Sequence, residues 1–446
     1  MCAKLVSVRR SRSLKVRDAV GIGIDFGTTN SSIALVTPAG GLRLAQFTLL
    51  GDPTESYRSL LYLEQHREQG RLTLKSWSGP FGIERYLDPD REPEQGRLMQ
   101  SLKSFLSSKS LKVTDVFGQK RSLEQLISRI LADLRAEAEK QFGMPVTSAT
   151  FGRPVRFVGS NDDEGDTYAE GRLAEACKLA GFETVQFELE PIAAAQYYAS
   201  TLDHEELILI GDFGGGTSDF SLVRVGPKGT SILGNAGLGL AGDAFDAKIV
   251  RHAVSPALGA GSAIRSVGGK VLPAPTWLYA NLERWHHLSF LKTREVTNLL
   301  QSVRAQSLEP DQIDALIHLI DSDAGYRLHR AVQKTKVALS AFDEAEFRFA
   351  DPGIELQSII RRAEFEEWIS DELRKIEDTV SGLLQSAKVD GKDVDCVFLT
   401  GGTSFVPAVR RIFESRFGGA DRIRSGNEFT SVARGLALHA ASPRQA

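Results

Sequence analysis

The chain has 446 residues, 42% of them hydrophobic and 25% charged, which is the composition of a globular protein with roughly two to four domains or subdomains. Its 54 basic and 57 acidic side chains give a net charge of −3, which excludes the strongly basic surface typical of nucleic-acid or anionic-membrane binding. The cysteines at 2, 177 and 396 have neither zinc-ligand spacing nor a disulfide pattern, so we expect a reducing, cytoplasmic location.

The first residues are basic, with many lysines and arginines between positions 4 and 17. The apolar run that follows is too short for a secretory signal, and no apolar run in the chain reaches the roughly 18 residues that span a bilayer. Residues 1–19 are therefore predicted to be a disordered basic tail, with an organelle address as the alternative.

The first half of the sequence predicts alternating strands and helices. Strands are expected at residues 20–26, 31–36, 42–47, 59–63, 149–151 and 185–189, helices at 122–142, 165–180 and from 192 onward, and a polar loop at 79–96. This alternation favours an α/β sheet whose faces are covered by helices.

The second half repeats this plan. Strands are expected at residues 207–211, 220–225 and 394–400, helices at 244–254, 364–387, 407–417 and 430–440, a glycine-, serine- and proline-rich interruption at 255–275 and mostly helical structure at 278–339. A repeated plan of this kind predicts a duplication with a cleft between the two halves.

Each half begins with the same short motif. Residues 23–30 read GIDFGTTN, and residues 211–219 read GDFGGGTSD. Both predict a strand, a tight turn and a second strand, and a turn without bulky side chains lets successive backbone N–H groups point at one phosphate. The aspartate beside each turn is compatible with phosphate only if a cation, most simply magnesium, lies between them. One copy alone would fit a plain hairpin turn, but two copies facing each other predict a polyphosphate clamp.

Four motifs together resemble the nucleotide-binding part of the actin, sugar-kinase and heat-shock ATPase superfamily, and within it the 70-kDa heat shock protein (DnaK-type) chaperones. Residues 25–30 and 212–219 resemble the two phosphate loops, 399–404 (LTGGTS) the adenosine loop, and 190–195 (EPIAAA) the connecting segment with its catalytic glutamate. They occur in the family order and cover about residues 20–442. The expected fold is therefore α/β, a duplicated actin-like ATPase fold with two lobes of mixed sheet and helices around a nucleotide cleft.

The resemblance implies ATP or ADP and magnesium as ligands, and it implies roles for individual residues. The catalytic set is Lys103, Glu190, Thr217 and Asp212; the magnesium set, acting through water, is Asp25 and Asp212; the nucleotide set is Gly27, Thr28, Thr29, Asn30, Gly214, Gly215, Gly216, Thr217, Gly242, Lys336, Ser340, Gly401, Gly402 and Thr403. The alternative for Lys103 is a solvated surface lysine, and for Glu190 a carboxylate that only starts a helix.

The sequence also departs from the family pattern. Val337 stands where the family has an arginine that stacks on adenine, and Gln333 replaces an acidic residue, so weaker nucleotide binding is expected. Residues 237–242 (GLGLAG) match the dinucleotide-binding G-x-G-x-x-G pattern, but no acidic residue follows at the required distance, so we reject that interpretation. The pattern GRPVRF at 152–157, with an enlarged segment at 255–330, most resembles YegD-type bacterial chaperone-like proteins.

The expected organisation is two lobes with an outer subdomain each. The predicted ranges are 1–19 for the tail, 20–205 for lobe I with 49–117 as its outer subdomain, 420–442 completing lobe I, and 206–419 for lobe II with about 234–362 as its outer subdomain. The sequence reaches its last residue before a peptide-binding part, so the expected function is a slowly hydrolysing ATPase that acts as a chaperone-like nucleotide switch on an unidentified protein partner, without nucleic acid or membrane. A sugar-type small-molecule kinase and a nucleotide-binding scaffold with little turnover remain as alternatives.

Overall fold

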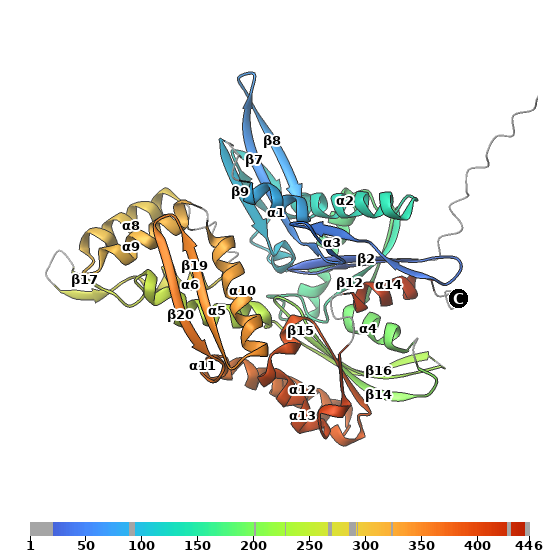
Figure 1. Cartoon of the computed structure of the whole chain (residues 1–446). Helices are drawn as coiled ribbons and strands as arrows, with labels where there is room; N and C mark the ends of the chain where they lie inside the picture. The colour runs from blue at the N-terminus through green and yellow to red at the C-terminus, as the bar shows by residue number, and fades with distance from the viewer. Residues whose placement is uncertain are drawn as a thin grey trace, which may run out of the picture.

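The computed structural model describes residues 21–88, 94–199, 202–227, 229–265, 270–284, 291, 293–322, 324–425 and 430–441. The predicted tail, residues 1–19, lies outside these ranges. The described chain is built on two central mixed sheets, which we call the sheets of lobe I and lobe II (Figure 1). The expected α/β class, with two sheets and helices around them, is confirmed.

The sheet of lobe I contains the first predicted hairpin. Its strand order is β13 (Thr184–Leu189), β12 (Ser148–Arg153), β1 (Gly21–Phe26), β2 (Asn30–Val36), β3 (Leu42–Leu44), with β6 (Tyr57–Arg58) also paired to β2. Strand β1 runs antiparallel to β2 and parallel to β12. Alternation along β1 places Ile22 and Ile24 in the core beneath α2 (Leu123–Phe142) and α3 (Asp163–Leu179). The opposite face carries Gly21 and Gly23, which lie against α14 (Ser431–Ala441).

The sheet of lobe II repeats this arrangement with the second hairpin. Its order is β16 (Gly229–Leu238), β15 (Ser218–Gly226), β14 (Glu206–Phe213), β21 (Cys396–Thr400), β22 (Ile423–Ser425). Strand β14 runs antiparallel to β15 and parallel to β21, as β1 does to β2 and β12. Helices α12 (Ser370–Ala387) and α13 (Pro407–Phe417) pack on one face and α4 (Glu190–Ala199) on the other.

The two lobes meet where α4 crosses α14. The crossing is close because both helices present small residues there: a Cβ added to Gly435 would lie 1.7 Å from the carbonyl oxygen of Ala193. Helix α14 also packs on β1, β2 and β12, so this one contact connects the layers of both lobes.

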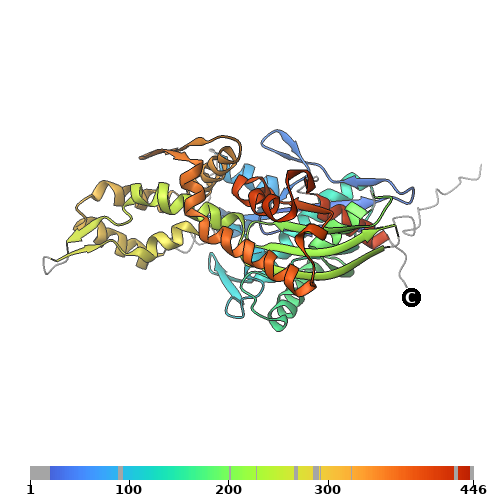
Figure 2. The ribbon, with the colours of Figure 1, turned by 90° about the horizontal axis from the view of Figure 1, so that it is seen from below.

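Smaller elements surround each sheet. Around lobe I they are β4 (Phe47–Leu49), β5 (Asp52–Thr54), β7 (Leu60–Glu68), β8 (Arg71–Ser78), α1 (Gly79–Leu87), β9 (Gln95–Gln100), η2 (Leu102–Phe105), β10 (Val113–Val116) and β11 (Gln119–Ser122). Around lobe II they are α5 (Gly242–Ile249), η3 (Val250–Val254), η4 (Ser255–Leu258), β17 (Ala263–Arg265), β18 (Val271–Pro273), α6 (Thr276–Glu283), α8 (Arg294–Gln306), α9 (Pro310–Asp321), α10 (Gly325–Ala341), β19 (Glu344–Asp351), β20 (Ile354–Arg361), α11 (Arg362–Trp368), η6 (Gly391–Asp393), η7 (Gly402–Phe405) and η8 (Ala420–Arg422). The segment from β17 to α9 extends away from both sheets (Figure 2).

Two expectations about local structure are wrong. The polar loop expected at 79–96 begins as helix α1, because Pro80 occupies its first turn and Ile83 and Tyr86 bury their side chains at helical spacing. The single helix expected at 364–387 is two helices, α11 and α12, separated at Ile369. Within the described residues, no helix combines the length and hydrophobicity needed to cross a membrane.

Candidate functional site

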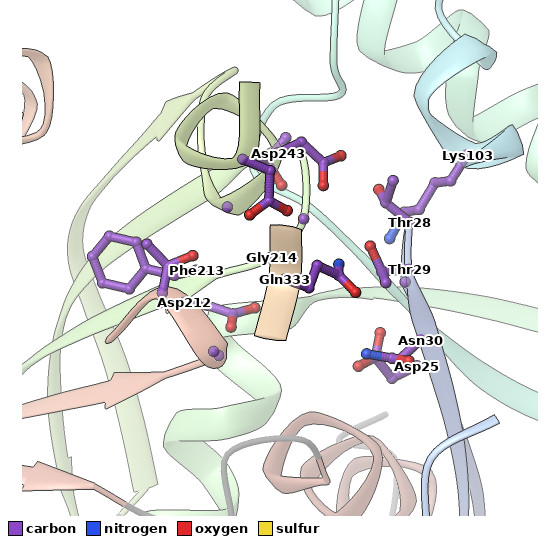
Figure 3. Close-up of a pocket in the computed structure, with 18 of the residues that line it drawn as sticks. Asp25, Thr28, Thr29, Asn30, Lys103, Asp212, Phe213, Gly214, Asp243 and Gln333 are labelled. Atoms are coloured by element: carbon purple, nitrogen blue, oxygen red, sulfur yellow. The ribbon is translucent and has the colours of Figure 1, made fainter. Parts of the chain in front are cut away.

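A cavity of about 280 Å³ lies between the lobes and is lined by the turns of both hairpins. Other wall residues come from η2, the first residues of α4 and α5, helix α10, and the loop after β21. The structure places sixteen predicted residues in this wall: Asp25, Gly27, Thr28, Thr29, Asn30, Lys103, Glu190, Asp212, Gly214, Gly215, Thr217, Gly242, Lys336, Gly401, Gly402 and Thr403. Figure 3 shows the two hairpins on opposite sides of the cavity, with Thr28 and Thr29 facing Gly214.

The turns of the hairpins approach each other so closely that side chains are excluded. A Cβ on Gly215 would lie 2.5 Å from the hydroxyl oxygen of Thr29 in the facing turn, and one on Gly27 would lie 2.2 Å from the carbonyl oxygen of Asn30 within its own turn. The second turn is closed by the Gly214 N–H, which donates to the carbonyl of Thr217 at 2.9 Å. Backbone and hydroxyl donors therefore dominate this end of the cavity, as a phosphate site requires.

Two carboxylates come from the ends of equivalent strands, Asp25 from β1 and Asp212 from β14. The Thr400 hydroxyl donates a hydrogen bond to Asp212 and fixes its orientation. Burial, reinforced by the negative charge of Glu190, raises the pKa of Asp212 to about 6 and raises the pKa of Asp25 well above its ordinary value. Carboxylates that repel in this way favour a cation between them.

These carboxylates fit magnesium bound through water. The described residues contain no group of three or more histidine, cysteine or acidic side chains arranged to enclose a metal ion. Magnesium keeps several of its waters and usually takes only one or two protein carboxylates together with substrate phosphates. Asp25 and Asp212, each beside the turn of its own hairpin, provide that donor set.

Lys103 and Glu190 form a buried ion pair in the cavity wall that also holds the hairpin turns, with 2.6 Å between Nζ and Oε1. Lys103 reaches the cavity from η2, which follows Ser101 in a left-handed backbone conformation, and Glu190 is the first residue of α4. Burial alone would lower the pKa of Lys103, but the negative charges of Glu190 and Asp25 have the larger combined effect. The pKa of Lys103 is therefore raised. The ammonium therefore persists inside the cavity, and a solvated surface lysine is excluded.

The opposite end of the cavity is formed by α5, α10 and the loop after β21. Lys336 pairs with Asp246 at 2.7 Å and donates to the carbonyl of Gly242 at 3.1 Å. A Cβ on Gly242 would be 3.0 Å from the hydroxyl oxygen of Thr403, and Gly401 has a φ of 84° with no space for a side chain against Phe213. These close approaches form a narrow slot beside Val337, whose side chain is 68% exposed.

Two predicted residues lie outside this wall. Ser340 turns back along α10, and its hydroxyl donates to the carbonyl of Lys336 at 3.2 Å. Gly216 lines a neighbouring cavity of about 490 Å³ together with Ser104 and Val158. Ser340 follows Lys336 on α10 and Gly216 follows Gly215 in the hairpin turn, but both point away from the cavity that these neighbours line.

Five wall residues were not in the predicted site: Arg58, Phe213, Asp243, Asp246 and Val432. Gln333 and Val337, predicted as departures from the family at the nucleoside, also line the wall. Asp243 and Asp246 follow the predicted residue Gly242 at the acidic start of α5, so their position in the sequence indicates that they lie near the site. Arg58 has no such signal, because it enters the site only through the pairing of β6 with β2.

His329, on α10 behind the slot, gives an expected dependence of stability on pH. Burial lowers its pKa to about 4, with Lys336 and Arg58 acting in the same direction and Asp246 opposing them. Between the unfolded pKa of about 6.5 and this value, the unfolded chain binds a proton that the folded chain excludes. His329 should therefore lower the free energy of unfolding by up to about 1 kcal/mol per pH unit as the pH drops from 6.5 to 4, while the raised pKa values of Asp212 and Asp25 contribute in the opposite direction.

Thermal melting between pH 7 and pH 4.5 tests this expectation. His329→Gln should lose less stability than the parent as the pH falls, whereas His318→Gln, which alters a half-exposed histidine on α9, should follow the parent. Parallel curves for the parent and His329→Gln would show that His329 does not carry the effect.

Comparisons with known proteins give one consistent family. The family model described as "Hsp70 protein" matches residues 85–259 and 303–443. The chain is 26% identical to "Chaperone protein DnaK" of Deinococcus deserti over 444 residues, covering 95% of the chain and 59% of that protein. It is 25% identical to "Stromal 70 kDa heat shock-related protein, chloroplastic" of Pisum sativum, covering 92% and 51%, and 25% identical to "Chaperone protein dnaK" of Thalassiosira pseudonana, covering 94% and 62%. The chain thus spans about half to three fifths of the length of these relatives.

Proposed function

The chain belongs to the Hsp70 protein family, and from this membership we propose that its cleft binds ATP together with magnesium and hydrolyses it. The membership confirms the predicted resemblance to DnaK-type chaperones and the duplicated actin-like ATPase fold that it implied. The chain carries an ATP-binding domain of the chaperone type. Magnesium dependence, hydrolysis and the roles of individual residues are the proposal.

The observation that best supports hydrolysis is the buried Lys103–Glu190 pair beside the two phosphate turns. The N–H groups of residues 27–29 and 214–217 would hold the phosphates, and magnesium bound near Asp25 and Asp212 would neutralise phosphate charge. Lys103 would orient the attacking water and offset the charge on the γ-phosphate, while Glu190 keeps the ammonium in place. Water then bonds to the γ-phosphorus as the bond to the bridging oxygen breaks, giving ADP and phosphate.

A nucleotide held by both hairpins would connect the two lobes, which also meet at the α4–α14 crossing and where the Val155 N–H donates to Asp219. We propose that exchange between ATP and ADP changes the relative position of the lobes and so presents or hides a surface for a protein partner. The names of the relatives describe chaperones, and a client protein is the corresponding partner for this chain.

Turnover by the purified chain tests the proposal. Phosphate release from ATP should occur without any acceptor, should require magnesium and should stop with EDTA. The same assay should include unfolded polypeptide, as a candidate client, and a panel of sugars and other hydroxyl compounds. Turnover only in the presence of a hydroxyl acceptor would instead identify a kinase, and tight ATP binding without turnover would identify a scaffold.

A further inference from the structure

The cations of the nucleotide cavity differ in how they are neutralised. Lys103 pairs with Glu190, and Lys336 pairs with Asp246. Arg58 also lines the cavity, but in the part of the chain that the structure describes it makes no ion pair with a carboxylate. It is therefore the cavity cation whose charge the described residues leave available for a ligand.

Arg58 is attached firmly to the first phosphate turn. Strand β6 pairs with β2 so that Arg58 lies opposite Asn30, and its guanidinium donates to the Asn30 side-chain oxygen at 3.0 Å. The next residue, Ser59, donates its N–H to the carbonyl of Thr29 at 2.9 Å. The backbone on both sides of the guanidinium is thus fixed relative to the donors that face the phosphates.

The surroundings of Arg58 make its charge costly without an anion. Burial lowers the pKa of Arg58, opposed by Tyr326 and by Asp243 from the facing wall, while Arg330 adds like-charge repulsion. A guanidinium has five N–H donors, and the hydrogen bond to Asn30 uses one of them. The remaining donors form a planar fork, which matches the oxygens of a phosphate group better than a lysine ammonium does.

We propose that Arg58 is a phosphate ligand that lobe I supplies to the bound nucleotide, donating its free N–H groups to phosphate oxygens of ADP and ATP. This inference rests on the proposed function and deepens it. It also places more of the binding energy at the phosphate end of the cleft, opposite the slot where Val337 offers adenine an aliphatic side chain. The site should consequently discriminate strongly between ADP and adenosine.

Calorimetric titration of the full chain with magnesium-ADP and with adenosine tests the proposal. Arg58→Gln should weaken ADP binding about 10-fold or more, because a charge-assisted hydrogen bond is lost, and should leave adenosine binding within about twofold. Arg58→Lys should recover part of the loss, since it keeps the charge without the fork. Arg330→Gln is the matched control, because it removes a neighbouring positive charge that does not line the cavity, and it should change ADP affinity less than about threefold.

Three outcomes would overturn the inference: unchanged ADP affinity in Arg58→Gln, equal losses for ADP and adenosine, or an equal loss in Arg330→Gln. If adenosine binds too weakly to titrate, the salt dependence of ADP binding replaces it, and the slope against salt concentration should decrease in Arg58→Gln but not in Arg330→Gln. Circular dichroism and melting temperature show whether each variant is folded. Failure of the parent chain to bind ADP would reject the proposed function itself, which separates that result from a failure of Arg58 alone.

Discussion

Replacing Lys103 with alanine is expected to lower the kcat of ATP hydrolysis about 100-fold or more, while ATP affinity stays within about threefold. The reason is the position of the ammonium: it is buried at the phosphate end of the cavity, 2.6 Å from Glu190, and its raised pKa keeps it charged. In the proposed mechanism the ammonium would offset charge that develops on the phosphate during transfer, whereas other groups, the backbone donors of the two turns among them, would hold the bound nucleotide.

Single-turnover phosphate release, together with a separate binding titration, measures both parts of this prediction. Lys109→Ala is the matched control, because Lys109 lies six residues further along, is exposed and pairs with Glu164 on the surface. Alanine leaves Glu190 without its cation, so Lys103→Gln is a second variant that fills more of the space. A parental kcat in a folded Lys103 variant would remove this residue from the catalytic set.

The Asp212→Asn variant is expected to bind magnesium-ATP about 10- to 100-fold more weakly than the parent, with most of the loss in the magnesium-dependent part of the affinity. Asparagine keeps a side-chain oxygen that accepts the Thr400 hydrogen bond, so the loop should retain its structure. What disappears is the negative charge that, in the proposed function, would hold a hydrated cation together with Asp25.

Titrations with ATP in the presence of magnesium and of EDTA separate the two contributions. Asp203→Asn makes the same chemical change on a fully exposed side chain just before β14 and should bind as the parent does. If Asp212→Asn and the parent respond equally to magnesium, Asp212 does not hold the ion.

The sequence predicted the central part of the site because its signals are local. In each hairpin the aspartate, the glycines and the threonine follow one another within a few residues, and the strand pairing of β1 with β2 and of β14 with β15 brings them into position directly. The same holds for Gly401, whose left-handed conformation comes at the end of a buried strand. The spacing of these residues and the family resemblance were enough to predict that they lie in one cavity. Their chemical roles stay predictions.

Other features depend on pairing between distant segments. Arg58 reaches the site because β6 adds to β2 after a 20-residue excursion, and no spacing rule in the sequence indicates that register. Hairpin β19–β20 is a different case: Ala345, Phe347 and Phe349 alternate with exposed residues, a period-two signal that was present and missed. Strand β16 was missed because its glycines weaken the strand pattern, and pairing with β15 compensates for them.

The crossing of α4 and α14 has a mechanical consequence. Helix α4 touches α14 at Ala193, and the same helix begins three residues earlier with Glu190. At this contact the backbones of the two helices lie directly against each other. A tilt of one helix over the other therefore cannot be taken up by side-chain movement. Such a tilt would move the first residues of α4 and displace the Glu190 carboxylate from Lys103. Helix α4 thus carries both the contact with α14 and half of the buried ion pair, so a change in the angle between the lobes would also change the alignment of that pair.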